Sequence, residues 1–235
     1  MLIGIWAFIC AENIVPAFML PSPLDVAHAF IRDFSLLMQH TSVTLVEAFW
    51  GLSLGIIVGF IVAVLMDEFN FAYRSFYPLV VLTQTIPTIA IAPLLVLWMG
   101  YGMAPKMVLV ALTTFFPITI GLLDGFKSAD KDMVDLMRAM GAGKLQIFRY
   151  IKLPGSMTHF FSSLKISVTY SIVAAVISEW LGGFEGLGVY MIRVKKSYAF
   201  DEMFAVIFLI SILSLVLMKL IDLLKYTALK WERAK

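Results

Sequence analysis

The chain has 235 residues, of which 61% are hydrophobic, well above the roughly 45–50% apolar share of soluble domains. At about 20 residues per span, this length allows about six transmembrane helices and excludes a sizeable soluble domain. The net charge of +2 gives no preference for nucleic acid, the single cysteine (Cys10) excludes an intrachain disulfide, and no Cys/His spacing indicates a metal site. We therefore expect an all-α, multi-pass membrane protein in which residues 1–235 form one transmembrane domain.

The first 15 residues are mostly apolar, but no Lys or Arg precedes the apolar run. The positively charged start of a signal peptide is therefore missing, and we interpret residues 1–15 as a short first span that ends near Pro16 to Pro23. Residues 24–42 are expected to form an amphipathic segment at the membrane interface.

The second predicted span runs from about Val43 to Met66 and carries Gly51, Gly55 and Gly59 at four-residue intervals. Such a glycine stripe lets two helix backbones approach closely, so we expect this face to pack against another helix. Glu47 lies near the end of the span, where a structural salt bridge is favoured over a role in transport.

The third predicted span, within residues 75–105, has no charged residue but contains four prolines and a polar cluster that includes Gln84, Thr85 and Thr88. Pro87 frees a backbone carbonyl, which a membrane tolerates only where protein or a water-filled cavity satisfies it. We expect these three side chains to line a translocation pathway. The alternative is that they only bond neighbouring helices.

Three further spans complete the prediction. The fourth, from Met107 to Leu123, repeats the polar and proline pattern with Thr113 and Pro117 four residues apart, and Thr113 joins the predicted pathway. The fifth, from Phe160 to Leu181, adds Tyr170 and Glu179 to the predicted pathway, with Glu179 facing an outer vestibule unless it pairs with Arg193 or Lys195. The sixth runs from Met203 to Lys219 and leads to a basic tail.

Residues 128–154 form the longest polar segment of the chain. An apolar stripe that includes Leu136 and Met140 predicts a short helix, which Ser128 or Asp130 can cap. Gly141 can end this helix in the left-handed conformation, and a second short helix should follow and stop at Pro154. The predicted unit is a helix-Gly-helix loop with an exposed apolar ridge, which needs a partner surface.

This segment resembles the EAA loop of ATP-binding-cassette importer permeases. Asp135-Leu136-Met137, Gly141 and Ile151-Lys152-Leu153-Pro154 match the spacing of its pattern, EAA, three residues, G, nine residues, I-x-L-P, although Asp, Leu and Met replace the first three positions. In that family the loop docks into a cytoplasmic ATPase subunit. The resemblance therefore implies a coupling role for nine residues: Asp135, Leu136, Met137, Met140, Gly141, Leu145, Ile151, Leu153 and Pro154.

The wider chain, with LPSP at Leu20 to Pro23, QTIP at Gln84 to Pro87 and EWLGG at Glu179 to Gly183, is similar to nitrate, sulfonate, taurine and thiamine-precursor permeases. TQTIP, FFPITIGLLDG and DLMRAMGA look most like the thiamine pyrimidine-precursor branch. The resemblance implies a homodimer in membrane lipid, an extracytoplasmic substrate-binding protein, and ATPase subunits that bind ATP and Mg²⁺, with no cofactor or enzymatic activity in this chain. The alternatives are a sulfonate, taurine or nitrate permease, and an ion-gradient-driven secondary transporter.

The distribution of Lys and Arg predicts the orientation. With six spans, one side receives Arg32, Lys106, Arg193, Lys195 and Lys196, and all other Lys and Arg residues fall on the opposite side. This excess places residues 128–154 and both termini in the cytoplasm, where an ATPase partner would be. Gly143-Lys144 is no nucleotide-binding loop, because Arg138 and Leu145 stand where Gly and Ser/Thr are needed.

Overall fold

A computed structural model describes residues 2–12, 14–16 and 19–229, and within these ranges the regular structure is entirely helical. In chain order the helices are α1 (Leu2–Ala11), α2 (Pro23–Arg32), α3 (Phe34–Glu68), α4 (Asn70–Thr85), α5 (Thr88–Met99), α6 (Met103–Lys127), α7 (Lys131–Ala139), α8 (Lys144–Ile147), a π-helical turn (Phe148–Lys152), α9 (Leu153–Gly182), α10 (Leu187–Lys196) and α11 (Phe200–Ala228). This confirms the predicted all-α fold. The predicted residues of the basic tail beyond Leu229 lie outside the described ranges.

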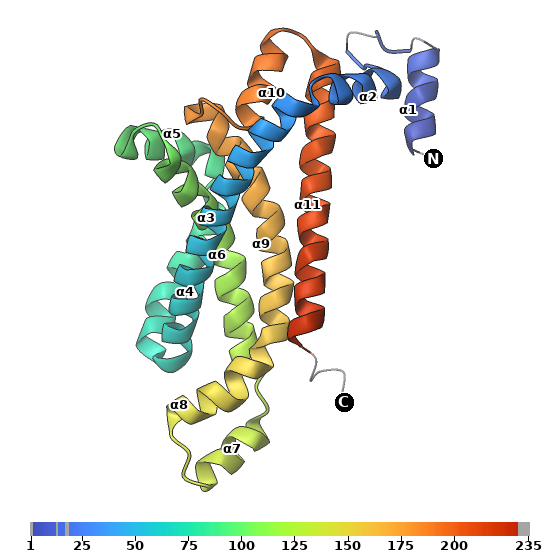
Figure 1. The fold of residues 1–235 in the computed structure, drawn as a ribbon. Helices are drawn as coiled ribbons and strands as arrows, with labels where there is room; N and C mark the ends of the chain where they lie inside the picture. Colours follow the sequence, from blue (N-terminus) through green and yellow to red (C-terminus); the bar gives the residue numbers. More distant parts are fainter. Residues whose placement is uncertain (1, 13, 17–18, 230–235) are drawn as a thin grey trace.

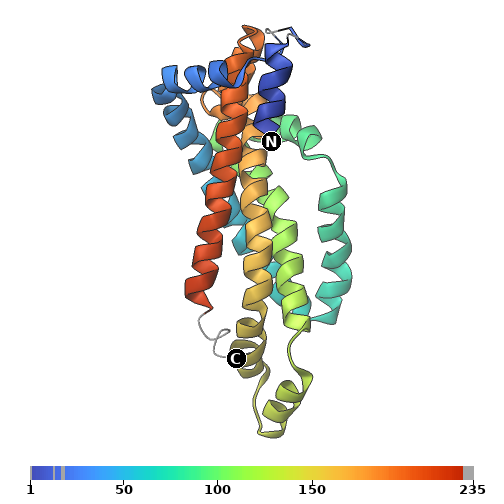
Figure 2. The ribbon, with the colours of Figure 1, turned by 90° about the vertical axis from the view of Figure 1, so that its right-hand side faces the viewer.

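Four long apolar segments run along the bundle, with α6 packed between α3 and α9 (Figures 1 and 2). They are α3, α6, the continuous helix Lys144–Gly182 and α11, and each is long and apolar enough to cross a membrane. The bent pair α4 and α5 brings the number to five if it counts as one span. The six predicted spans are therefore not all present in the described residues, because α1 has only 10 residues.

The close contact between α3 and α6 depends on small residues. A side chain at Gly51, Gly55 or Gly59 would meet Val110, Thr114 or Ile118 of α6 at 3.0 Å or less. The predicted glycine stripe is thus confirmed as a packing face, and its partner is α6. In lipid, the hydrophobic effect no longer drives helices together. The dispersion contacts between such closely packed backbones therefore contribute to the attraction between α3 and α6.

The predicted interfacial segment is only partly correct. The amphipathic helix α2 ends at Arg32, and residues 34–42 already belong to α3, so the spanning helix begins nine residues before Val43. A capping box starts α2, because Ser22 and Asp25 each accept a backbone N–H of the other. The same contacts lower the pKa of Asp25, chiefly through the hydrogen bond from the Ser22 hydroxyl.

The third predicted span is broken in two. Helix α4 ends at Thr85, Ile86 and Pro87 are extended, and α5 begins at Thr88 with its axis bent by 101° from that of α4. Pro87 therefore separates two helices, because its ring and missing N–H prevent the first from continuing. Gln84 and Thr88 lie on either side of this break, Gln84 near the end of α4 and Thr88 at the start of α5.

Pro154 does not stop the second helix of the loop. The chain continues from α8 through the π-helical turn into α9, giving one helix from Lys144 to Gly182. In the turn the Leu153 N–H donates to the carbonyl of Phe148, five residues back. This wider turn places Pro154 at the start of α9, where the N–H that proline lacks is not required.

Candidate functional site

A cavity of about 310 Å³ opens beside the break between α4 and α5. Its polar wall consists of Thr83, Gln84 and Thr88 from the broken pair, Thr113 from α6 and Tyr170 from α9. Val173, Ala174 and Ile177 of α9 supply apolar surface. None of the described residues that line it is charged, so its walls offer hydrogen bonds and an aromatic ring to a neutral solute.

The cavity brings together four of the six residues predicted for the pathway, namely Gln84, Thr88, Thr113 and Tyr170. Thr85 is exposed beside the break and does not line the cavity. Its hydroxyl donates to the carbonyl of Leu82 in its own helix. The bend between α4 and α5 at Pro87 places Thr88 next to α6 and α9. The direction of this bend could not be predicted from the proline alone.

Glu179 corrects the prediction most clearly, because its side chain is 1% exposed and faces neither a vestibule nor Arg193. One carboxylate oxygen accepts the Thr44 hydroxyl at 2.6 Å, and the other accepts the Gly188 N–H at 2.5 Å. Glu179 therefore joins α9 to α3 and to the start of α10. It positions this end of the bundle rather than lining the cavity.

The start of α10 receives three such acceptors from other helices. Besides Gly188, the Leu187 N–H donates to the Thr44 hydroxyl at 2.9 Å, and the Gly186 N–H donates to His40 Nδ1 at 3.0 Å. Nδ1 accepts this bond, so the proton of the neutral ring is on Nε2. Helix ends leave such N–H groups unsatisfied, so these side chains cap α10.

Glycine is required in this turn because the backbone approaches Glu179 closely. Gly186 has φ +118, and a Cβ there would lie 2.2 Å from the Glu179 carboxyl carbon. A Cβ at Gly188 would lie 2.2 Å from the Val176 carbonyl oxygen. This glycine-rich turn is thus a close-approach site, and sequence reasoning missed its partners His40 and Thr44.

Glu47 forms a buried ion pair with Lys106, with Glu47 Oε1 2.5 Å from Lys106 Nζ and both side chains under 10% exposed. This confirms the predicted structural salt bridge and identifies the partner that sequence reasoning did not name. Breaking such a pair on one side leaves an uncompensated buried charge, which is strongly destabilising. In the described residues, no group of three or more His, Cys, Asp or Glu could hold a metal ion.

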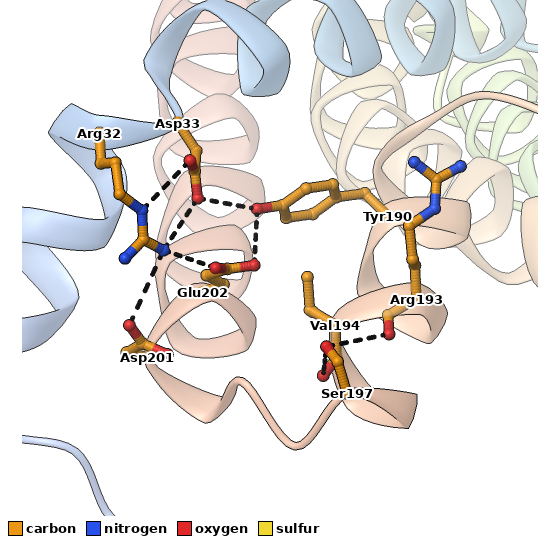
Figure 3. A network of polar contacts seen from close by, with 8 residues as sticks. All are labelled: Arg32, Asp33, Tyr190, Arg193, Val194, Ser197, Asp201 and Glu202. Carbon is orange, nitrogen blue, oxygen red and sulfur yellow. Dashed lines mark hydrogen bonds and ion pairs between the residues drawn. The ribbon is translucent and has the colours of Figure 1, made fainter.

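A second polar network ties α2, α3, α10 and α11 together at the same end of the molecule (Figure 3). Arg32 contacts Asp33, Asp201 and Glu202, and the Tyr190 hydroxyl lies 3.2 and 3.1 Å from Asp33 and Glu202. Burial, together with these two carboxylates, raises the pKa of Tyr190 above its usual range, so the phenol stays protonated and can donate.

The helix-Gly-helix loop stands at the opposite end of the molecule (Figure 1). Asp130 caps α7 by accepting the N–H groups of Asp132 and Met133, and Gly141 has φ +84, so both predictions for this turn are confirmed. The ridge residues Leu136, Met140 and Leu145 are 56%, 78% and 78% exposed. Large apolar side chains so exposed indicate a partner surface.

The other predicted coupling residues contribute differently. Asp135 is exposed and pairs with Arg138 at 3.1 Å, whereas Met137, Ile151, Leu153 and Pro154 are half-buried. Leu153 packs against the apolar cluster around Phe126, which fixes the base of the loop to the bundle. Two ion pairs add to this attachment, since Lys152 binds Asp67 at 2.8 Å and Lys144 binds Glu68 at the end of α3.

Comparison with known proteins assigns this arrangement. Residues 55–228 match the model of a family described as the binding-protein-dependent transport system inner membrane component. The chain belongs to this family. It is the membrane-spanning permease of an ATP-binding-cassette importer, a transport subunit rather than an enzyme, and a multi-pass protein of the inner membrane. The resemblance predicted from the loop is confirmed.

Two relatives match the permease over nearly its whole length. The formylaminopyrimidine transport permease protein ThiX of Halalkalibacterium halodurans is 37% identical over 234 residues, 99% of this chain and 93% of that protein. A probable ABC transporter permease protein of Haemophilus influenzae is 37% identical over 221 residues, 94% of this chain and 90% of that protein. The taurine transport system permease protein TauC of Escherichia coli is more distant, at 24% identity, with 92% of this chain and 81% of that protein covered.

Solved structures show the same fold. The inward-facing MetNI methionine ABC transporter gives a TM-score of 0.73 over 82% of the permease and 96% of the compared chain, at 21% identity. The family implies an ATPase and a substrate-binding protein as partners.

Proposed function

We propose that this permease imports a pyrimidine precursor of thiamine, of the formylaminopyrimidine type. The observation that carries the proposal is the uncharged, hydrogen-bonding lining of the cavity at the α4–α5 break. The Gln84 amide and the Thr88 and Tyr170 hydroxyls offer donors and acceptors, and the Tyr170 ring can stack on a flat heterocycle. The Thr83 and Thr113 hydroxyls donate to carbonyls of their own helices and offer acceptors. Similarity to the formylaminopyrimidine permease supports the same choice.

A sulfonate, taurine or nitrate substrate fits this cavity less well. Each carries a full negative charge, and removing that charge from water needs a cation or an array of donors. The nearby Lys106 is buried and bound to Glu47, so it does not face the cavity. The volume of about 310 Å³ lies at the lower end of the roughly 300–1,000 Å³ range of small-molecule sites, as suits a single small ring.

The mechanism we propose is alternating access by a homodimer embedded in lipid. The exposed ridge of α7 and α8 is the surface for an ATPase subunit that binds ATP and Mg²⁺. Lys144 and Lys152, next to this ridge, form ion pairs with the end of α3, and α8 continues into α9 as one helix. These links provide a rigid connection from the ATPase subunit to the cavity-lining helices. Residues 128–154 and the end of α11 lie in the cytoplasm in this proposal, and the binding protein docks at the opposite face. Helix α1 lies near that opposite face (Figure 1), which does not fit the predicted cytoplasmic N-terminus.

Uptake in proteoliposomes tests the substrate. With the ATPase and binding protein present, a labelled aminopyrimidine should accumulate only with ATP, and excess unlabelled taurine, alkyl sulfonate or nitrate should not compete. ATP-dependent uptake of a sulfonate without aminopyrimidine uptake would refute the substrate and leave the permease assignment intact.

Gln84→Leu tests the cavity itself. It removes a donor and an acceptor from the lining at similar volume, so we expect the KM for uptake to rise about five- to tenfold, the effect of one or two neutral hydrogen bonds. Thr85→Val is the matched control, because it also replaces a polar group by an apolar one but outside the cavity. Equal effects of the two changes would exclude the cavity as the pathway.

A further inference from the structure

Behind α7 lies a second cavity, of about 390 Å³, which the transport mechanism does not use. It is lined by the ends of α3 and α6, by α7 and by Lys152. Four cations, Lys127, Lys131, Arg138 and Lys152, line it together with the carboxylates of Asp67 and Asp135. The cavity is therefore positively charged, unlike the neutral cavity at the α4–α5 break.

The two faces of α7 are used separately. Lys131, Asp135 and Arg138 recur at i, i+4 and i+7 and face this cavity, whereas Leu136 and Met140 project from the ridge. An occupant of the cavity would thus contact α7 without covering the ridge. Helix α7 makes more close backbone contacts with α8 than with any helix of the bundle, so an occupant could bridge it to α6.

The charges in the cavity are not balanced internally. Asp67 binds Lys152 through both oxygens, at 2.9 and 2.8 Å, and Asp135 binds Arg138 at 3.1 Å. Lys127 Nζ lies 4.2 Å from the centre of the Tyr73 ring, and no carboxylate within 4 Å of Lys131 is found in the described residues. Nearby Asp130 is engaged in capping α7. Two lysines thus remain available to an anion.

The location favours a lipid phosphate. The cavity lies where the apolar spans α3 and α6 end, the level of the headgroups, and Phe126 and Val134 give it an apolar floor. Basic pockets between membrane helices bind anionic headgroups in this way. We propose that this cavity binds the phosphate group of an anionic phospholipid through Lys127 and Lys131, and that the bound headgroup holds α7 against the bundle.

Native mass spectrometry of the purified full-length chain, titrated with phosphatidylglycerol, tests this. We expect saturable binding that phosphatidylcholine with the same acyl chains does not reproduce. Lys127→Gln with Lys131→Gln should weaken it about 30-fold, since each lysine near an anionic lipid contributes about fivefold. Lys127→Arg with Lys131→Arg should restore binding, and Lys219→Gln with Lys225→Gln is the control, because it removes two basic residues from the same end outside the cavity.

Three results would overturn the proposal: unchanged phosphatidylglycerol binding in the Lys127/Lys131 glutamine variant, an equal loss in the control, or equal binding of phosphatidylcholine. Soluble glycerol phosphate distinguishes the source of the phosphate. Lysine-dependent binding of glycerol phosphate without preference for phosphatidylglycerol would overturn the lipid assignment and assign the site to a phosphate from solution.

Discussion

Three backbone N–H groups at the start of α10 depend on side chains from other helices, and Glu179 accepts the shortest of these bonds. Glu179→Ala would leave the Gly188 N–H and the Thr44 hydroxyl without this partner in a buried setting. We expect a loss of about 3 kcal/mol in the free energy of unfolding, seen as a thermal midpoint lower by roughly 5–10 °C in detergent.

The control for this change is Glu185→Ala, which removes an exposed carboxylate from the same turn. It should leave the thermal midpoint almost unchanged. A similar shift in both variants would mean that net charge, not the contacts of Glu179, stabilises the turn.

Single residues show where sequence reasoning succeeds. The salt bridge of Glu47 could be predicted because an isolated carboxylate in an apolar span needs a partner, but Lys106 could not be chosen without the α3–α6 register. The role of Glu179 was misjudged for the same reason. Its partner Thr44 is 135 residues away, and the Gly188 N–H becomes available only because an unpredicted helix begins there.

At the scale of elements, the turn between α7 and α8 allows a sharp test. Gly141 has φ +84, and a Cβ added there would have no atom within 4 Å, so Gly141→Val adds backbone strain without a clash. The strain of about 1–2 kcal/mol should be relieved by a local shift that displaces the ridge. We expect a folded permease with weaker ATPase co-purification and loss of substrate-dependent ATP hydrolysis.

Gly143→Val is the matched control, because Gly143 has φ −75 and a Cβ there would lie 3.9 Å from Gln146 Oε1, an ordinary contact, so the same side chain adds no such strain. Met140→Leu, which keeps the ridge apolar, should also be nearly silent. Wild-type ATPase coupling in Gly141→Val would exclude this turn as the coupling element.

Whether a helix ends at a proline was the hardest feature to predict from the sequence. The sequence marks Pro87 and Pro154 equally, yet the first separates two helices at 101° and the second sits near the start of α9 after a π-helical turn. Both prolines lack the backbone N–H that a helix interior needs. Which outcome follows depends on tertiary contacts, such as the packing of Leu153 against the cluster around Phe126.

Across the whole molecule, the two ends are polar in different ways. Helices α2 and α10 lie at one end and α7 and α8 at the other (Figure 1). The first end is held by side chains that bond between helices, whereas the second carries most of the Lys and Arg residues of the described chain. The described chain begins near the first end, at α1, and α11 finishes toward the second. The charge asymmetry favours a cytoplasmic location for α7 and α8.

Labelling of single cysteines in intact cells tests this orientation, after Cys10 is replaced. Tyr198, between α10 and α11, and Met140, at the end of α7, suit it because they are 79% and 78% exposed, so accessibility alone does not separate them. Their helices lie at opposite ends of the permease (Figure 1). A membrane-impermeant maleimide should label Tyr198→Cys from outside the cell. Few basic residues lie at that end of the permease, so the positive-inside rule places that end outside the cytoplasm. Met140→Cys should react only after the membrane is opened. Labelling of Met140→Cys in sealed cells, with Tyr198→Cys protected, would show the opposite orientation. A cytoplasmic ATPase could not then reach the ridge.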